Sequence, residues 1–144
     1  MAVQRLEHVG IVVEDLEAAT EFFTLLGLER RGGTSVEGSW VDRIVGLESV
    51  RSEIVMLRAP DGGEVELAKF HSPPSEPADP RAPSNAPGLR HITFLVEGIE
   101  SLVAELQERG FGLVGELERY ENAYLLCYVR GPEGIIVELA ERIG

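Results

Sequence analysis

Two kinds of side chain that can bind a metal ion occur at matching places in the two halves of this 144-residue chain. His8 lies in the segment Leu6–Gly10, and His91 lies in a similar segment 83 residues later. Glu66 and Glu138 occupy matching places in two further segments, 72 residues apart. A single strand histidine or glutamate is usually only solvated, but recurrence of the pair in both halves indicates a shared role.

The chemistry of this set is that of a divalent-ion site. A buried, unpaired carboxylate tends to take up a proton, whereas a divalent ion keeps carboxylates charged and imidazoles neutral. We therefore predict that one ion is bound by His8, Glu66, His91 and Glu138. Two nitrogen and two oxygen ligands suit zinc, nickel, cobalt, manganese or iron(II). Four protein ligands leave a six-coordinate ion with open positions for catalysis or ligand capture.

Other side chains are weaker candidates. Glu64 competes with Glu66 as a ligand, but it has an apolar residue at its repeat position. His71 has no counterpart in the repeat, so we expect it to open the linker and to be exposed. Arg43 and Arg130 are candidates for binding a substrate anion, although a repeat partner of Arg130 favours a structural role at a turn. Aromatic candidates for lining a pocket are Trp40, Phe70, Tyr120 and Tyr124.

The repeats indicate which elements carry the four ligands. Each histidine stands near the start of a strand that alternates between a wholly apolar face and the face of the histidine. A helix follows, with Asp15 suited to its N-cap, an apolar stripe over residues 18–26 and Gly27 at its end. Gly110 has the same place after the second helix. Each glutamate lies on the last strand of its half.

Three further strands are predicted to complete each half. In the second half they span 112–118, 124–130 and 135–141, with a turn at Pro132–Gly134. The segment Ser39–Leu47 fits either a short helix or a strand. We predict an α+β fold of two tandem βαβββ modules, each forming part of a curled, half-barrel mixed sheet.

The predicted modules span residues 1–70 and 89–144, with a proline-rich linker at 71–88. Six of the eight prolines fall in this linker. Proline fixes φ and lacks an amide donor, so the segment is unsuited to a helix or a central strand. A module of about 70 residues is too small to be very stable alone.

Composition excludes several classes of partner. The net charge of −12 and the lack of a basic stripe argue against nucleic acid and anionic membrane surfaces. No apolar run reaches the roughly 18 residues of a membrane span, and the N-terminus does not resemble a signal peptide, so we expect a cytoplasmic protein. The single cysteine, Cys127, is interpreted as a small apolar residue of a strand.

The paired modules, the segment His8–Val13 before a helix and the segment Pro132–Leu139 resemble the vicinal oxygen chelate superfamily. That group includes glyoxalase I, methylmalonyl-CoA epimerase, extradiol dioxygenases, fosfomycin-resistance enzymes and bleomycin-binding proteins. The resemblance covers nearly the whole chain except the linker. It implies a metal-ligand set similar to that of glyoxalase I: His8, Glu66, His91 and Glu138.

The resemblance also implies an activity: a lyase or isomerase whose ion binds two adjacent oxygens of a small substrate and stabilises an enediolate. Glu138 is the favoured general base, with Glu66 in the mirrored position. A hemithioacetal of an α-ketoaldehyde is one fitting substrate.

Two alternatives remain at this point. An iron(II) extradiol-type dioxygenase uses two histidines and one carboxylate, so a fourth ligand at Glu66 counts against it. A metal-free protein that binds a drug or metabolite is opposed by the complete ligand set. We also expect a homodimer, because short sheets leave exposed edges. In such a dimer, the four ligands of one metal site are supplied either by one chain or by both chains.

Overall fold

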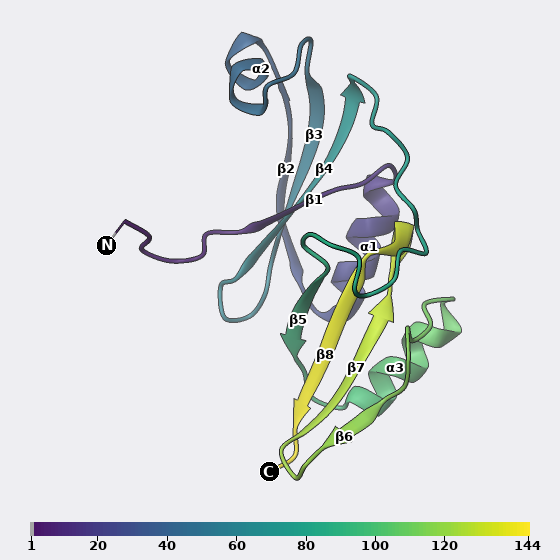
Figure 1. The fold of residues 1–144 in the computed structure, drawn as a ribbon. Coiled ribbons are helices and arrows are strands. Elements are labelled where there is room, and N and C mark those ends of the chain that lie inside the picture. Colours follow the sequence, from purple (N-terminus) through teal and green to yellow (C-terminus); the bar gives the residue numbers. More distant parts are fainter. Residues whose placement is uncertain (1) are drawn as a thin grey trace. The chain divides into compact units, whose positions relative to one another are not determined.

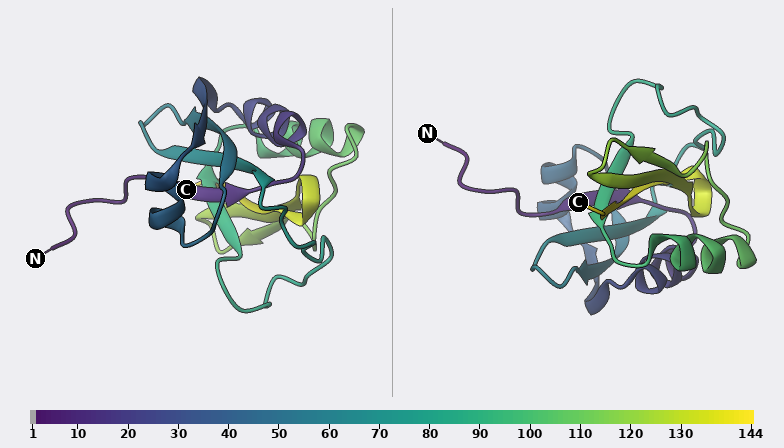
Figure 2. Two further views of the ribbon diagram at one scale, coloured as in Figure 1. Left: turned by 90° about the horizontal axis from the view of Figure 1, so that it is seen from above. Right: turned by 90° about the horizontal axis from the view of Figure 1, so that it is seen from below.

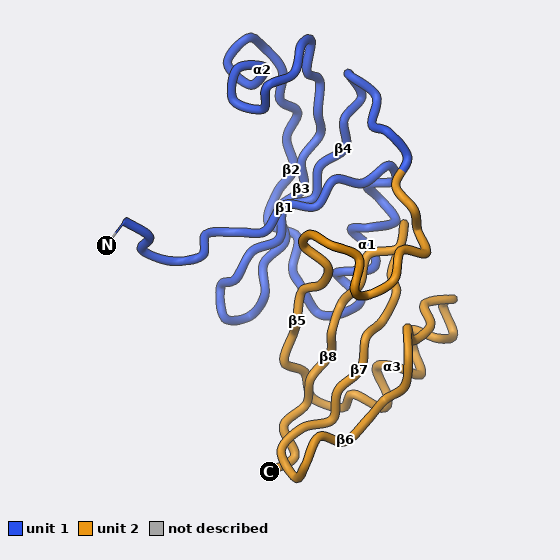
Figure 3. Tube along the Cα trace, in the orientation of Figure 1, with its two compact units in different colours: residues 1–77 blue, residues 78–144 orange. Residues whose placement is uncertain are grey.

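The computed structural model describes residues 2–144, which divide after Pro77 into two compact units (Figure 3). The division falls within the proline-rich segment 71–88. Residues 71–77 belong to the first unit, and residues 78–88 belong to the second unit. Residues 2–8 precede the first strand and extend away from it in Figure 2.

The first unit contains four strands and two helices (Figure 1). They are β1 (Val9–Val12), α1 (Leu16–Leu26), β2 (Glu29–Glu37), α2 (Ser39–Val45), β3 (Arg51–Arg58) and β4 (Glu64–Ser72). The sheet order is β1-β4-β3-β2; β1 pairs with β4 in parallel, and the other neighbours are antiparallel. The ambiguous segment that begins at Ser39 is therefore a short helix between β2 and β3.

The second unit repeats this topology. Its elements are β5 (His91–Leu95), α3 (Ile99–Glu108), β6 (Glu118–Tyr120), β7 (Tyr124–Arg130), a 3-10 turn (Pro132–Gly134) and β8 (Ile136–Arg142). The order β5-β8-β7-β6 matches that of the first sheet, and β5 pairs with β8 in parallel. The predicted α+β fold of two tandem βαβββ modules is confirmed, and each sheet is open rather than closed into a barrel.

The helix ends follow from local chemistry. Asp15 caps α1 by accepting a hydrogen bond from the Ala18 amide at 3.0 Å. Gly27 ends α1 in the left-handed conformation at φ 113°, and Gly110 follows α3 at φ 90°. Such angles are strained for residues with a Cβ, which explains glycine at both places.

The start of α3 differs from that of α1. Its N-cap position is Gly98, which has no side chain to accept a hydrogen bond. The carboxylate of Glu141 on β8 instead accepts hydrogen bonds from the amides of Gly98 at 2.8 Å and Ile99 at 3.0 Å. These bonds lower the pKa of Glu141, the bond from Ile99 having the larger effect. A residue distant in sequence therefore caps this helix.

Each unit has its own apolar core between a helix and one face of a sheet. In the first unit, α1 contributes Phe22 and Phe23, whose rings meet edge to face at 5.2 Å between centroids. The strand residues that are fully buried include Leu57 and Leu67 in the first unit and Val129, Val137 and Leu139 in the second. Burial of this helix-facing surface leaves the opposite face of each sheet for the predicted ligands.

One predicted strand is wrong in its position. The segment 112–118 is not a continuous strand: Leu113 forms an isolated bridge with Val129, and β6 begins only at Glu118. The chain bends at Val114 and Gly115, so the ladder with β7 is interrupted between the two pairings. Among residues 2–144, no helix is long and apolar enough to span a membrane.

Candidate functional site

In the first unit, the predicted ligands His8 and Glu66 lie side by side. His8 immediately precedes β1, and the parallel pairing of β1 with β4 places Gly10 opposite Glu66. The Nε2 atom of His8 is 3.4 Å from Oε2 of Glu66. The side chains are 37% and 28% exposed, so the pair is accessible to a small ligand.

The second unit contains an equivalent pair. His91 is the first residue of β5, and Thr93 stands opposite Glu138 in the pairing with β8. The Nε2 atom of His91 is 3.4 Å from Oε1 of Glu138, and the side chains are 34% and 20% exposed. In each unit, therefore, the histidine stands two residues before the residue that faces the glutamate.

The spacing within each pair suits an ion. A distance of 3.4 Å exceeds the usual length of an N–H···O hydrogen bond. Two ligands that each lie about 2.0–2.2 Å from one ion, at angles of about 90–110°, are separated by roughly 2.8–3.6 Å. Imidazole nitrogens and carboxylate oxygens are also the donors preferred by the predicted metals. The residues present therefore fit a divalent ion.

Each unit offers two of the four predicted ligands. Within residues 2–144, no third histidine, cysteine, aspartate or glutamate joins either pair to make a group of three that holds an ion. The assignment of all four residues to one ion thus stays a prediction from the repeat.

The contacts around Glu138 extend beyond His91. The hydroxyl of Thr93 donates a hydrogen bond to Oε1 of Glu138 at 2.7 Å. Tyr128 on β7 is the register partner of Glu138 on the neighbouring strand β8. The ring of Tyr128 lies 4.8 Å from that of His91 between centroids, and the two rings are tilted by 39°. The second pair is therefore held by cross-strand neighbours on both sides.

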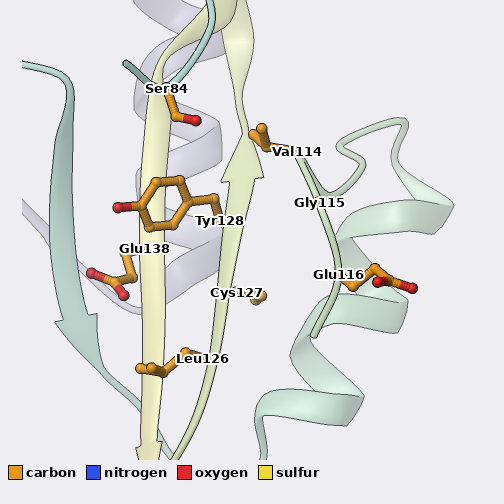
Figure 4. A pocket seen from close by; sticks show the side chains of 8 residues that line it. All are labelled: Ser84, Val114, Gly115, Glu116, Leu126, Cys127, Tyr128 and Glu138. Carbon is orange, nitrogen blue, oxygen red and sulfur yellow. The ribbon is translucent and has the colours of Figure 1, made fainter. Parts of the chain in front are cut away.

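A pocket of about 420 Å³ opens beside this second pair (Figure 4). Figure 4 shows the side chains of Leu126, Tyr128 and Glu138 projecting to one side of β7 and β8, as alternation along the strands requires. The lining residues are Ser84, Val114, Gly115, Glu116, Leu126, Cys127, Tyr128 and Glu138. A second pocket, of about 400 Å³, lies in the first unit and includes neither His8 nor Glu66.

Tyr128 is a pocket residue that the sequence analysis missed. The expected aromatics included Trp40 and Tyr120, which are 52% and 57% exposed and do not line the pocket beside Glu138. A signal was present in the turn at Pro132–Gly134. Closing that turn pairs Arg130 with Ile136, and counting back along both strands brings Tyr128 opposite Glu138.

The weaker candidates have structural partners. Glu64 forms an ion pair with Arg58 at 3.1 Å, which leaves Glu66 as the neighbour of His8. His71 is exposed as expected, but it lies in β4 rather than at the start of a linker, and its ring nitrogen contacts Glu53 on β3.

Arg130 has the predicted structural role. Its Nη1 donates to the carbonyl oxygens of Pro80 at 3.3 Å, Ala82 at 3.0 Å and Gly134 at 3.4 Å. Arg90 also binds this segment, through the carbonyl oxygens of Ala82 and Pro83. Two arginines thus bind residues 80–83 within the second unit, next to the pocket residue Ser84.

Cys127 is buried, as the sequence predicts for a small apolar strand residue. Burial raises the pKa of its thiol, the nearby charge of Glu138 adds to that effect, and a hydrogen bond with the Leu139 backbone opposes it. The thiol is therefore protonated at neutral pH, and it does not have the low pKa of a catalytic nucleophile.

Comparisons of the sequence and of the structure with known proteins point to the same family. Residues 7–128 match the family model of the glyoxalase/bleomycin resistance protein/dioxygenase superfamily, a span that includes His8, Glu66 and His91 but ends before Glu138. The structure of a glyoxalase family protein from Bacillus cereus is similar, with a TM-score of 0.95, 44% identity and coverage of 100% of this chain and 99% of that chain.

More distant relatives are also similar. The Bacillus subtilis protein YwbC is 26% identical over 142 residues, which cover 96% of this chain and 98% of the relative. The trypanothione-dependent glyoxalase I of Leishmania major has a TM-score of 0.68 at 22% identity, with coverage of 96% of this chain and 87% of that chain. At that identity the likeness shows the common fold alone.

Proposed function

Because the chain belongs to the glyoxalase/bleomycin resistance protein/dioxygenase superfamily, we propose that it is a metal-dependent lyase or isomerase of the glyoxalase I type. One divalent ion is held by a His–Glu pair from each module: His8 with Glu66, and His91 with Glu138. The modules that complete one site come from one chain or from two. Zinc, nickel, cobalt, manganese and iron(II) are the candidate ions.

The observation that supports this proposal is the equivalence of the two pairs. In both units Nε2 of the histidine is 3.4 Å from a carboxylate oxygen, and in both the histidine precedes the paired position by two residues. Recurrence of the arrangement in both units favours a shared role over two independently solvated surface pairs. The similarity to the glyoxalase I of Leishmania major concerns the fold and does not extend to the substrate.

The proposed chemistry is proton transfer next to a carbonyl group. When bound, the ion supplies Lewis acidity that stabilises negative charge on two adjacent substrate oxygens. A carboxylate of the site, Glu138 or Glu66, takes the proton from the carbon beside the carbonyl, and the electron pair of that bond forms an enediolate. The same group returns the proton to the neighbouring carbon. Tyr128 and the apolar side chain of Leu126 line the pocket beside Glu138.

The test combines metal analysis with a substrate assay. We expect protein purified without chelators to carry a stoichiometric divalent ion and to isomerise the hemithioacetal of methylglyoxal. His91→Ala should lose most of the ion and the activity, whereas the matched control His71→Ala, which alters a histidine outside both pairs, should keep both. Protein without an ion would instead support a binding function, and oxygen uptake with catechols would support a dioxygenase.

We further propose a homodimer. Each four-stranded sheet, taken by itself, ends in two edge strands, β1 and β2 in the first and β5 and β6 in the second. Open edges favour pairing with a further strand or chain. Light scattering coupled to size-exclusion chromatography should give twice the chain mass of 15.8 kDa, and a monomer at micromolar concentration would refute this.

A further inference from the structure

We propose that the proline-rich segment 79–88 is a fixed wall of the substrate pocket in the second unit, and that Ser84 on this wall is a specificity-determining residue. Arg90, Arg130 and Gly134 are positioning residues that hold the wall in place. The group of the substrate that meets Ser84 is uncharged. This inference rests on the proposed function, because it concerns what the same site accepts.

The segment is folded, although its composition is that of a linker. The amide of Arg81 donates to Oδ1 of Asp79 at 2.9 Å, and the amide of Ala82 donates to the carbonyl oxygen of Asp79 at 3.2 Å. A second turn is closed by the amide of Ala86, which donates to the carbonyl oxygen of Pro83 at 3.0 Å. Because proline fixes φ, few other backbone conformations compete with this folded one. The segment is therefore suited to keep one shape.

The arginine that holds the segment differs in role from its counterpart in the first unit. Arg58 forms an ion pair with Glu64 at 3.1 Å. At the repeat position of Glu64 the second unit has Ile136, so Arg130, the counterpart of Arg58, meets no carboxylate from that position. Arg130 instead donates to two carbonyl oxygens of segment 79–88. The substitution of one acidic residue thus makes an arginine available to the segment.

The turn glycines of the two units differ in the same sense. Gly62 and Gly134 are counterparts in the repeat, and both have positive φ, at 97° and 83°. A Cβ at Gly62 would have no heavy atom within 4 Å. A Cβ at Gly134 would lie 2.5 Å from the carbonyl oxygen of Pro80 and 2.7 Å from its Cα, closer than packed atoms come. Glycine at this turn therefore permits the close approach of the segment.

Ser84 is the residue of this segment that lines the pocket of about 420 Å³ with Glu138 and Tyr128. Figure 4 shows Ser84 above the ring of Tyr128 in the view. The side chain of Ser84 is exposed, and within residues 2–144 no protein group hydrogen-bonds to its hydroxyl. A serine hydroxyl both donates and accepts, so it is available to a polar atom of a ligand.

The charges of the pocket favour an uncharged group at this wall. Its charged lining residues are Glu116 and Glu138, so no lining side chain offers a positive charge to an anion. The arginines that bind the segment, Arg90 and Arg130, are engaged by its carbonyl oxygens. Figure 4 shows the side chain of Glu116 directed away from Tyr128 and Glu138, so it does not meet a cation there either. A charged group without a partner is costly to desolvate, which selects against it.

The first test measures the dissociation constants of hydroxamates with zinc-loaded protein by calorimetry. A hydroxamate offers two adjacent oxygens to the ion and needs no turnover. We expect wild-type protein to bind benzohydroxamate at least about tenfold more tightly than 4-carboxybenzohydroxamate, which differs by one remote carboxylate. Ser84→Arg places a cation on the wall and should remove this preference. Asn85→Arg, on the same segment but outside the pocket lining, is the matched control and should keep it.

The second test moves the wall. Gly134→Ala should displace the segment and weaken binding of benzohydroxamate roughly 5- to 20-fold, because the ring loses contacts on one side. Acetohydroxamate has no ring and should change by less than about twofold. Gly62→Ala has the same backbone strain without the collision, and it should leave both ligands unchanged. Arg90→Met, which removes three hydrogen bonds to the segment without adding strain, should weaken benzohydroxamate in the same sense as Gly134→Ala.

The outcomes separate this inference from the proposed function. Wild-type protein that binds no zinc would refute both. Zinc-loaded protein whose preference between the two aromatic hydroxamates is equal in Ser84→Arg and Asn85→Arg would overturn the role of Ser84 alone. Equal affinities for benzohydroxamate in Arg90→Met, Gly134→Ala and Gly62→Ala would show that the segment is not a wall of the pocket.

Discussion

Replacing Arg90 by methionine should release residues 79–88 from their contacts with the rest of the second unit. Arg90 donates three hydrogen bonds to this segment: Nη2 to the carbonyl oxygens of Ala82 and Pro83, both at 2.9 Å, and Nε to that of Pro83 at 3.1 Å. Methionine retains much of the apolar stem but has no donor. The two carbonyl groups then depend on water and on the remaining bond from Arg130.

The free energy that Arg90 contributes to holding the segment follows from its two carbonyl acceptors. A hydrogen bond from a charged donor contributes about 1.5–3 kcal/mol, so two carbonyl groups set an upper bound of about 3–6 kcal/mol. Both groups are reachable by water, and Arg130 still binds Ala82 in the variant. We therefore take half of that bound, about 1.5–3 kcal/mol. Since 1.4 kcal/mol corresponds to a factor of ten, the open form of the segment should become roughly 10- to 100-fold more populated.

Hydrogen exchange measures this opening directly. The amides of Ala82 and Ala86 donate to Asp79 and Pro83 within the segment, and their exchange rates should rise by that factor while amides of β7 and β8 change little. Arg109→Met, which removes an exposed arginine at the end of α3, is the matched control. Unchanged exchange at Ala82 and Ala86 in Arg90→Met would show that the arginine does not hold the segment.

Two further predictions concern groups with shifted pKa values. Because hydrogen bonds from the amides of Ile99 and Gly98 lower the pKa of Glu141, its contribution to stability is complete above its ordinary pKa of 4.5 and is lost as the pH falls through the lower folded-state value. Urea denaturation should therefore show Glu141→Gln destabilised at pH 7 and progressively less so in acid; a deficit that does not depend on pH would contradict this. Since burial raises the pKa of Cys127, its thiol should react with Ellman's reagent at least about tenfold more slowly in native protein than in urea, and equal rates would be inconsistent with the buried position.

Much of the local structure was predictable because it depends on neighbours in sequence. The alternation of apolar residues predicts the strands, and β7 (Tyr124–Arg130) has the predicted bounds. Asp15 and Gly27 predict the ends of α1, because an N-cap acceptor and a left-handed residue act within one helical turn. The internal repeat then extends these interpretations from one half to the other.

Errors arose where the pattern was locally ambiguous. The apolar residues of 112–118 suggested a strand, but pairing with β7 is interrupted there and resumes only at Glu118. Tyr120 and Trp40 are candidates for the pocket by residue type alone, whereas the position of Tyr128 depends on the register between two strands. Residue type without register does not identify the lining of a pocket.

The sequence by itself determined the duplicated modules, the order of their elements and the matching His–Glu pairs, since all of these follow from periodicity and repetition along the chain. Only the tertiary structure decided which side chains meet across long separations. Thr93 binds Glu138 from 45 residues away, and Glu141 caps α3 from 42 residues away. Such contacts depend on strand register and packing, where many distant partners are possible and local preferences do not choose among them.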